Sequence, residues 1–482
     1  MKYDVLIIGA GAVGSFIARN LSRYEINVAL LDKENDVGNV TSMANSAIIH
    51  SGYDPVPGTN KAKFNVLGNK MYDQIADELD VPFERIGSLT VALNDAQMEV
   101  LKDLAKRSAA NGVMVQLLQR EEVLKIEPNI NPEVKGALFA PTAGIIDPFS
   151  LVVHVAENAV DNGVNLFLNE EVVDIKKEND GFKVYTKRGD IFESKVVINA
   201  AGLYSAKIAK MVGDIDWDIT PRKGEYFVLD HYQKGLVNHT LFPLPSEKGK
   251  GVLVTFTTSG DYLVGPSSEP NDDADDLSTD SMTLANVRAQ ALDLVPSIPF
   301  YRAIRAFSGN RATGTKHDFI IETSSASDHF INLGGIESPG LVSSPALAEY
   351  VVDEFVKKVL VLREKASYNP RIRRYPRLKE MSLEERNKLI KENPDFGKIV
   401  CFCEQVSLGE VKDTLARSVP PRSIKAMKKR VRAGYGKCQG GFCQPNILAI
   451  LAKHYGLDWT DIDYDESNTN ILVEDVKRSH HE

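Results

Sequence analysis

Apolar positions follow two different periods along the chain. Residues 5–8 form a continuous apolar run that predicts a buried strand, and residues 12–21 carry apolar side chains at helical spacing. A second apolar run over residues 28–31 predicts another strand, which ends at the acidic Asp32. The amino-terminal pattern therefore predicts a strand–helix–strand unit.

The same mixture of periods continues before the pattern changes. Helical spacing recurs over residues 66–79, 98–104 and 151–160, and apolar runs predict strands over residues 87–93, 164–168 and 171–175 and from residue 195 onward. Residues 220–264 instead show a succession of alternating strands. We therefore expect an α/β fold, with a doubly wound domain and an inserted antiparallel-sheet domain.

A glycine-rich turn joins the first predicted strand to its helix. It reads Gly9-x-Gly11-x-x-Gly14, the spacing of the dinucleotide-binding motif in its required context. Gly9 permits the tight turn, Gly11 lets a pyrophosphate approach the backbone, and Gly14 lets the helix pack against the strand. The helix N-terminus offers N–H groups to the phosphates, and Asp32 is placed to bind a ribose hydroxyl. The motif leaves open whether the dinucleotide is FAD or NAD.

A polar segment rich in small residues follows the second strand, between residues 39 and 54. Its Ser42, Asn45 and Ser46 can donate hydrogen bonds to a second face of a bound dinucleotide. His50 is the titratable base of this segment, and an imidazole titrates near neutrality, which suits it to remove a hydroxyl proton. A purely structural histidine is the alternative.

Length and charge limit the class of protein. The 482 residues suffice for about three domains, and the net charge of −9 argues against nucleic acid as the main partner. Because no apolar run reaches the roughly 18 residues that a membrane helix needs, we expect no membrane span. Met1 leads directly into the first strand, so we expect no signal peptide and a cytoplasmic location.

The cysteines form a second chemical constellation. They occur as Cys401-x-Cys403 and as Cys438-x4-Cys443. In a cytosolic chain, disulfides are an unexpected use for such a cluster. Two close pairs of thiolates suit a tetrahedral sulfur site, which holds either zinc or an iron–sulfur cluster. The spacing alone does not distinguish these two.

Basic residues dominate two nearby segments. Residues 368–394 are basic and punctuated by prolines, which indicates a linker. One predicted helix then carries a run of five cations, namely Lys425, Lys428, Lys429, Arg430 and Arg432. Without interleaved aromatic residues this run does not indicate nucleic acid. We interpret it as a solvated face that balances an anionic cluster or docks a partner.

The segment from Ser46 to Lys63 resembles the flavoprotein family of D-amino-acid-oxidase fold. Within that family it is most similar to the branch that holds glycerol-3-phosphate oxidases and dehydrogenases and L-2-hydroxyglutarate dehydrogenases. The resemblance implies FAD rather than NAD. It also implies that His50 lies beside the flavin and acts as the base.

Three later segments resemble further cofactor motifs of this family. The strand over residues 171–175 implies that backbone groups of Val173 contact the adenine, and the turn at Gly202 implies a second close approach to FAD. Residues 330–345 resemble the closing FAD motif. That resemblance implies that N–H groups of a helix N-terminus face the flavin, at Gly340, Leu341 and Val342, and that Ser338 lies near the substrate.

Other segments resemble the family's substrate-binding positions. Residues 301–314 resemble a strand that carries a substrate-anchoring arginine, here Arg311. Lys250 matches in place a lysine near the substrate in the glycerophosphate branch. Residues 221–227 resemble an Arg-Gly-Glu-Tyr strand, but Lys223 interrupts that motif and leaves the role of Arg222 in doubt.

The cysteine-rich segment resembles the bacterioferritin-associated-ferredoxin-like (BFD-like) domain, with helices expected over residues 408–418, 422–432 and 444–455. This resemblance favours a 2Fe–2S cluster over zinc as the group held by Cys401, Cys403, Cys438 and Cys443.

We therefore expect an FAD-dependent oxidoreductase over residues 1–365, a linker over 366–395, a small helical 2Fe–2S domain over 396–457 and a tail over 458–482. Within the first part, the FAD-binding segments are expected at about 1–80, 145–215 and 310–365, and the substrate-domain segments at about 81–144 and 216–309.

The resemblances imply a dehydrogenase that oxidises a small anionic hydroxy compound. The first expectation is glycerol 3-phosphate, oxidised to dihydroxyacetone phosphate by hydride transfer to the flavin while Arg311 and Lys250 hold the anion. Since a flavin accepts two electrons and a 2Fe–2S centre carries one, we expect electrons to leave through the cluster. Their acceptor would be a protein, such as another flavoprotein subunit of a multi-subunit dehydrogenase. The alternatives are an L-2-hydroxyglutarate or other 2-hydroxy acid dehydrogenase and a non-catalytic electron-relay subunit.

Overall fold

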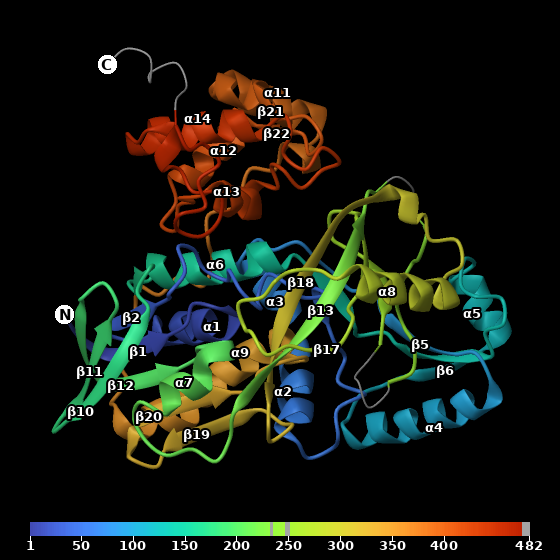
Figure 1. Ribbon diagram of the computed structural model, residues 1–482, viewed down its shortest axis with the longest axis horizontal. Helices are drawn as coiled ribbons and strands as arrows, with labels where there is room; N and C mark the ends of the chain where they lie inside the picture. Colours follow the sequence, from blue (N-terminus) through green and yellow to red (C-terminus); the bar gives the residue numbers. More distant parts are fainter. Residues whose placement is uncertain (232–234, 246–250, 475–482) are drawn as a thin grey trace.

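The computed structural model describes residues 1–231, 235–245 and 251–474. In it, the predicted strand–helix–strand unit is the centre of the first sheet (Figure 1). β1 (Lys2–Ile8) leads into α1 (Ala12–Leu21), and β2 (Val28–Leu31) pairs with β1 in parallel. The strand order of this sheet is β10 (Val172–Glu178), β11 (Gly181–Thr186), β12 (Ile191–Asn199), β1, β2 and β9 (Asn165–Phe167). In addition, β20 (Ser327–Gly334) pairs with β12, and β19 (Ile320–Ser324) pairs with β20.

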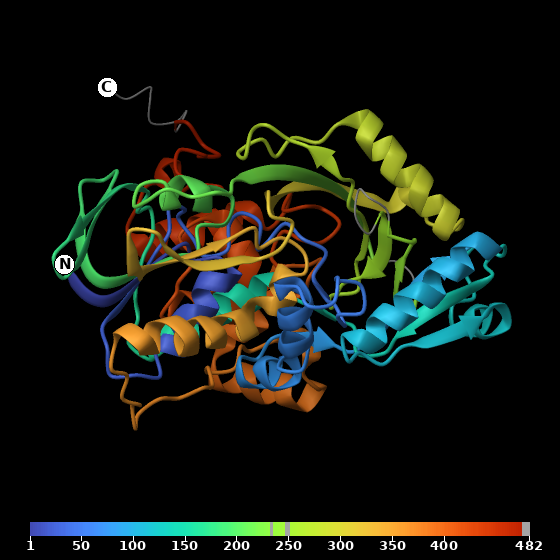
Figure 2. The same ribbon diagram turned by 90° about the horizontal axis from the view of Figure 1, so that it is seen from below.

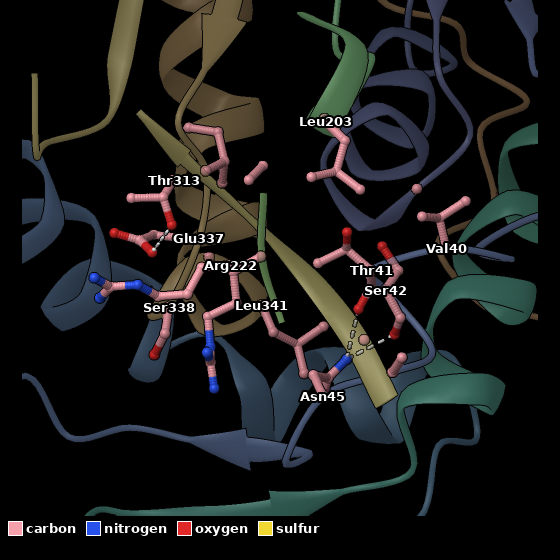
Figure 3. Close-up of a pocket in the computed structure, with 18 of the residues that line it drawn as sticks. Val40, Thr41, Ser42, Asn45, Leu203, Arg222, Thr313, Glu337, Ser338 and Leu341 are labelled. Atoms are coloured by element: carbon pink, nitrogen blue, oxygen red, sulfur yellow. Dashed lines mark hydrogen bonds between the residues drawn. The ribbon is translucent and has the colours of Figure 1, made fainter. Parts of the chain in front are cut away.

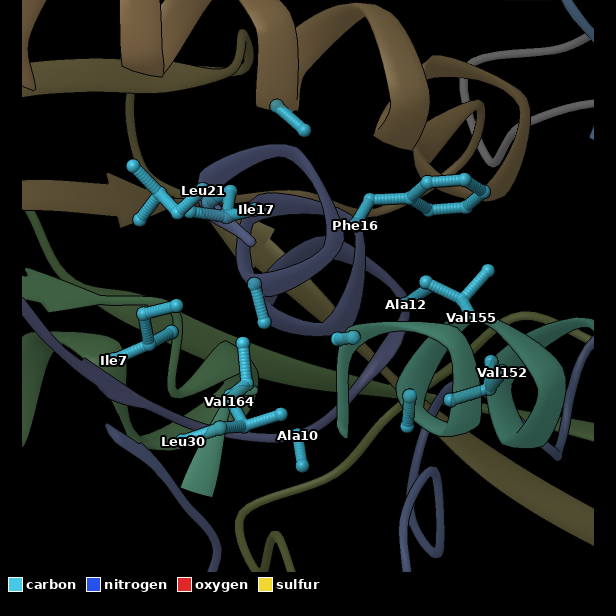
Figure 4. Close-up of a cluster of buried hydrophobic side chains, with 14 of the residues drawn as sticks. Ile7, Ala10, Ala12, Phe16, Ile17, Leu21, Leu30, Val152, Val155 and Val164 are labelled. Carbon is cyan, nitrogen blue, oxygen red and sulfur yellow. The ribbon is translucent and has the colours of Figure 1, made fainter. Parts of the chain in front are cut away.

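The main hydrophobic core lies between this sheet and the helices that cover it. In Figure 4, α1 carries Ile17 and Leu21 over Ile7 and Leu30 of the strands. Helix α6 (Pro148–Asp161) packs against α1 through Val152 and Val155, and α9 (Gly340–Val351) packs against the other side of α1. Gly14 makes this close packing possible, because a Cβ atom there would lie 1.9 Å from the Gly9 carbonyl oxygen. The role predicted for Gly14 in helix packing follows directly from this contact.

A second, largely antiparallel sheet is inserted between segments of the first. Its longest strands, β13 (Ile219–Leu229) and β18 (Ala303–Gly314), pair antiparallel over nearly their whole length. From β17 (Glu269–Pro270) and β13 the order continues through β16 (Tyr262–Gly265), β15 (Leu253–Phe256), β14 (Thr240–Phe242), β5 (Ser88–Ala92), β7 (Gly136–Ala140) and β6 (Gln116–Gln119). Figure 2 shows its helices α4 (Asp95–Ala110) and α8 (Ser281–Leu294) at the end of the molecule away from the N-terminus.

A small sheet connects the two parts. β3 (Ile48–Ile49) pairs with β8 (Gly144–Ile146), which also pairs with β4 (Phe83–Glu84), so His50 directly follows a fixed strand. The helix predicted over residues 66–79 is divided into α2 (Asn60–Asn69) and α3 (Tyr72–Glu78). At this break the Asn69 side chain turns inward and donates to the carbonyl oxygens of His50 and Thr142.

The carboxy-terminal segment forms a separate small core above α6 (Figure 1). It contains the hairpin β21 (Ile399–Cys401) and β22 (Val406–Ser407) and the helices α12 (Leu408–Leu415), α13 (Ile424–Val431) and α14 (Gln444–Tyr455). The fold class predicted from the sequence is therefore confirmed. The segment before this domain carries α11 (Leu383–Glu392). Its Ile372 and Tyr375 pack in the main hydrophobic core, and its Leu378 is also buried. Among the described residues, no helix has the length and apolarity that a membrane crossing requires.

The interpretation of the basic run as a solvated face is wrong. Lys428, Lys429 and Arg430 of α13 are all buried. Helix α13 packs against α6 and against the loop after β2, where the carboxylate of Asp36 accepts from both Lys429 and Arg430. Lys429 and Arg430 are therefore paired within the chain, at the contact between the carboxy-terminal domain and the loop after β2.

Candidate active site and cluster site

A cavity of about 1220 Å³ lies where the carboxyl ends of the parallel strands meet the second sheet. Its walls come from the glycine turn, the segment from Gly38 to Ile48, strands β13 and β18, and the residues just before α9. Figure 3 shows Val40, Thr41 and Ser42 at one side of this cavity, with Arg222 and Ser338 at the other. The cavity therefore joins the nucleotide-binding motif to the inserted sheet.

The glycine turn keeps side chains out of one end of the cavity. Gly9 has a φ of +104°, and a Cβ atom there would lie 2.5 Å from the Ala200 carbonyl oxygen. Gly11 lines the cavity, and the nearest neighbour of a Cβ atom there would be the Ser42 hydroxyl at 3.1 Å. The first turn of α1 is thus open toward the cavity, as phosphate binding at a helix N-terminus requires.

Two carboxylates face the same end. Asp32 accepts hydrogen bonds from the backbone N–H groups of Ala10 at 2.6 Å and Glu34 at 2.9 Å. Burial raises the pKa of the Asp32 carboxyl, and these two N–H donors oppose that rise. Glu170 also lines the cavity, and its Oε2 is buried without a hydrogen-bond partner in the described part of the chain. A turn without side chains beside two carboxylates that line the cavity fits the phosphates and hydroxyls of a dinucleotide such as FAD.

The polar loop is held in shape by hydrogen bonds within itself and to the neighbouring elements α1 and β13. The Ser42 hydroxyl accepts from the Ala12 N–H at 2.9 Å, at the start of α1. The Asn45 amide donates to the Thr41 and Ser42 carbonyl oxygens, as the dashed lines in Figure 3 show. Ser46 shares a hydrogen bond of 3.1 Å with the Tyr226 hydroxyl of β13. These three side chains line the cavity while they hold the loop to its neighbours.

The structure brings most of the predicted cofactor residues to the cavity wall. Those that line it are Gly9, Gly11, Asp32, Ser42, Asn45, Ser46, Gly202, Gly340 and Leu341. Gly14 lies behind the turn and Val342 is buried within α9. Val173 is 45% exposed, and its neighbours Glu171 and Val172 line the cavity instead.

His50 and Ser338 lie close together in the cavity. Ser338 Oγ is 3.5 Å from His50 Nε2. The His50 ring centroid is 5.9 Å from that of Phe242, and its carbonyl oxygen accepts from Asn65 and Asn69 of α2. The imidazole is therefore held at a fixed backbone position, with a hydroxyl beside its outer nitrogen. Lys250, the other predicted contact for the substrate, lies outside the described residues.

Two arginines form the polar wall of the cavity on the inserted sheet. Arg222 of β13 and Arg311 of β18 are cross-strand partners, and both line the cavity. A Cβ atom at Gly224 would lie 2.7 Å from Arg311 Nη2, so the guanidinium passes directly over this glycine. Among residues 1–231, 235–245 and 251–474, neither arginine forms an ion pair, whereas the nearby Lys61 is paired to Glu337 at 2.8 Å.

The place of Arg222 is the main finding that the sequence did not supply. Lys223 interrupts the resemblance, but its side chain forms an ion pair of 2.6 Å with Asp276 and leaves Arg222 to the cavity. The usable signal was the alternation of a strand, since Arg222 and Lys223 must project to opposite faces.

The cysteines converge at the edge of the carboxy-terminal domain. Cys403 Sγ and Cys438 Sγ are 3.7 Å apart, and Cys401 and Cys443 are buried beneath them. A hydrogen bond with Cys443 lowers the pKa of the Cys401 thiol to about 6, which favours the thiolate that metal binding needs. A Cβ atom at Gly436 would lie 2.3 Å from that of Cys403, so the two ligand loops meet closely only because Gly436 has no side chain. Four thiols from two loops fit an iron–sulfur cluster or zinc.

Family comparisons decide between the cofactors that the geometry allows. Residues 4–354 match the family described as FAD dependent oxidoreductase, and residues 399–453 match the BFD-like [2Fe-2S] binding domain. The chain belongs to the family of FAD dependent oxidoreductases. Its cofactors are FAD and a 2Fe–2S cluster, as the two family resemblances implied.

Individual relatives resemble the chain over most of its length. It is 46% identical to a glycerol 3-phosphate dehydrogenase of Caloramator mitchellensis, over 98% of this chain and 99% of the relative. A glycerol 3-phosphate oxidase of Mycoplasma genitalium is 35% identical over 76% of this chain and 97% of its own. The solved structure of dithionite-reduced L-alpha-glycerophosphate oxidase from Mycoplasma pneumoniae, with FAD bound, matches with a TM-score of 0.74 and 33% identity, over 77% of this chain and 98% of that one.

Proposed function

We propose that this FAD-dependent oxidoreductase oxidises glycerol 3-phosphate to dihydroxyacetone phosphate. The observation that carries the proposal is the pair Arg222 and Arg311, two guanidinium groups without carboxylate partners among the described residues, in the cavity that also holds His50. Guanidinium groups bind phosphate through paired hydrogen bonds, which lysine cannot form. The glycerol 3-phosphate enzymes among the relatives support the same substrate.

His50 is the proposed base. Its Nε2 takes the hydroxyl proton of the substrate while the carbon of the same group loses a hydride and the carbonyl double bond forms. When bound, FAD supplies the acceptor for that hydride. Ser338, 3.5 Å from Nε2, is placed to orient the hydroxyl group. The arginine pair fixes the phosphate and so turns a collision into a positioned reaction.

The cluster is the proposed exit for the electrons. Cys401 and Cys443 are buried in the core of the carboxy-terminal domain, whereas Cys403 is exposed to solvent. Phe402 and Phe442, each next to a cysteine, are 72% and 79% exposed. Large apolar side chains beside an exposed cluster ligand suit the docking of a protein electron acceptor, since aromatic residues are enriched at protein interfaces. We therefore propose a dehydrogenase that passes electrons to a protein acceptor, such as a flavoprotein subunit of a larger enzyme.

Anaerobic mixing tests the substrate. The purified protein is mixed with glycerol 3-phosphate or with L-2-hydroxyglutarate, and the flavin absorbance is followed. Bleaching by glycerol 3-phosphate alone is the expected result. Absence of bleaching by either compound would contradict the proposed reaction and favour a relay subunit or another substrate.

L-2-hydroxyglutarate is the second candidate, and one observation favours it. Two neighbouring arginines can each bind one carboxylate of a dicarboxylate, just as they can share one phosphate. Bleaching by this compound alone would transfer the same mechanism to a 2-hydroxy acid.

A further inference from the structure

Helix α13 of the cluster domain inserts two cations beneath the loop that follows β2. The Asp36 carboxylate of this loop is buried, and it accepts two hydrogen bonds of 2.9 Å from the Arg430 guanidinium. Lys429 Nζ lies 2.6 Å from the same carboxylate. One buried carboxylate thus holds two buried cations from a domain that begins hundreds of residues later.

Lys429 and Arg430 use their remaining hydrogen bonds differently. Arg430 turns back to its own domain, where it donates to the carbonyl oxygens of Val419 and Ala426. Lys429 instead donates to the FAD-binding part, to the Val37 carbonyl oxygen at 3.0 Å and to Asn39 Oδ1 at 2.6 Å. Its side chain is 2% exposed, so water does not substitute for these acceptors. Lys429 is therefore bonded to three residues of the loop, namely Asp36, Val37 and Asn39.

The loop that Lys429 holds is a wall of the FAD cavity. Gly38, Asn39 and Val40 line that cavity. The Gly38 N–H donates to the Ala10 carbonyl oxygen at 3.0 Å, within the glycine turn. A few residues further, Ser42 accepts from the Ala12 N–H at the start of α1. A short chain of bonds thus connects the Lys429 ammonium to the turn that faces the phosphates.

We propose that Lys429 is a positioning residue for FAD, so that docking of the cluster domain and binding of FAD stabilise each other. Without the ammonium, three oxygens of the loop lose a donor, and the loop is freer to leave the glycine turn. Coupling between two binding events is reciprocal, so FAD must stabilise the docked helix by the same factor by which the helix strengthens FAD binding. This inference holds for either candidate substrate.

Lys429→Met is the informative variant. Methionine fills much of the buried space of the lysine stem, while Arg430 keeps both of its hydrogen bonds to Asp36, so that no isolated charge remains. Lys453→Met is the matched control, because Lys453 is exposed on α14 of the same domain. Neither residue is among those that line the cavity.

FAD affinity is measured on the full-length protein with its cluster, after removal of the flavin. Titration with FAD, followed by flavin fluorescence, is expected to give a Kd about tenfold higher for Lys429→Met than for the parent, within the usual range of coupling between sites. Lys453→Met is expected to bind as the parent does. Unchanged affinity in a Lys429→Met protein of normal iron content and normal circular dichroism would overturn the proposal.

Hydrogen exchange on the parent protein supplies a second test that needs no variant. Amides of α13 are expected to exchange more slowly when FAD is added to the deflavinated protein, whereas amides of the distant α4 are expected to keep their rates. Equal exchange of α13 with and without FAD would overturn the coupling. If the helix stabilised the fold without any coupling to the cofactor site, the exchange rates of α13 would not respond to FAD.

Discussion

Arg222 and Arg311 stand directly opposite each other on the antiparallel strands β13 and β18. Like charges at such a position repel and destabilise a sheet by up to about 1 kcal/mol. The same repulsion makes the pair a strong site for an anion, because a bound phosphate or carboxylate offsets it. The arrangement is costly in the free protein and favourable in the complex.

The arginine pair gives the first prediction. Arg222→Met is expected to lower kcat/KM for glycerol 3-phosphate about 10- to 100-fold, the loss that follows removal of a charge-assisted hydrogen bond. It is also expected to raise the Tm of the substrate-free protein, because the repulsion is gone. Calorimetry of the two substrate-free proteins measures this rise in Tm. When inorganic phosphate is added, the Tm of the parent protein should rise and that of the variant should stay unchanged. A variant with normal kcat/KM would remove Arg222 from the anion site.

His50 gives the second prediction. His50→Gln keeps a polar side chain of similar reach but has no base, so the rate of flavin reduction by substrate is expected to fall about 10²- to 10⁴-fold. Stopped-flow absorbance measures this rate directly, independently of any acceptor. His454→Gln is the control, because His454 is exposed at the end of α14. Similar rates for all three proteins would show that another group takes the proton.

Two glycines of the same turn are expected to fail in different ways. A Cβ atom at Gly14 would lie 1.9 Å from a backbone oxygen, so Gly14→Ala is expected to destabilise the folded protein even without FAD. A Cβ atom at Gly11 would meet only the Ser42 hydroxyl at 3.1 Å, but it would project into the cavity. Gly11→Ala is therefore expected to retain the Tm of the flavin-free parent and to bind FAD weakly. Thermal unfolding and FAD titration of both variants separate the two effects, and weak FAD binding together with an unchanged Tm in Gly14→Ala would contradict this assignment.

The sequence predicted those parts of the site that depend on neighbouring residues. The glycine turn, Asp32 and the paired cysteines are local patterns, and their geometry follows from the elements that flank them. His50 was singled out as a base from its own segment, and the family resemblance placed it beside the flavin and added Arg311. Arg222 was left in doubt because Lys223 interrupts the family motif. Its place opposite Arg311 depends on the register between two strands that are far apart along the chain.

The basic run of α13 failed for a related reason. A charged helix is expected to face solvent unless its partners are known, and the partner of Lys429 in Asn39 lies 390 residues earlier. No periodicity within the helix reveals that contact. Burial of charge by a distant segment is a property of the tertiary structure, which brings Lys429 against a loop that lines the cavity.

The exposed cysteine gives the last prediction. Cys403 lies at the outer edge of the cluster site, and replacing this thiolate with serine is expected to impair the cluster. The flavin cavity is formed by other residues, so flavin reduction by substrate should proceed at the parent rate in Cys403→Ser. Transfer of electrons onward to a one-electron protein acceptor is expected to fall strongly, because the proposed exit is lost. Iron analysis and the visible spectrum measure cluster content in the same samples. If Cys403→Ser loses its iron but still reduces a protein acceptor at the parent rate, the electrons leave from the flavin itself and the cluster is not their exit.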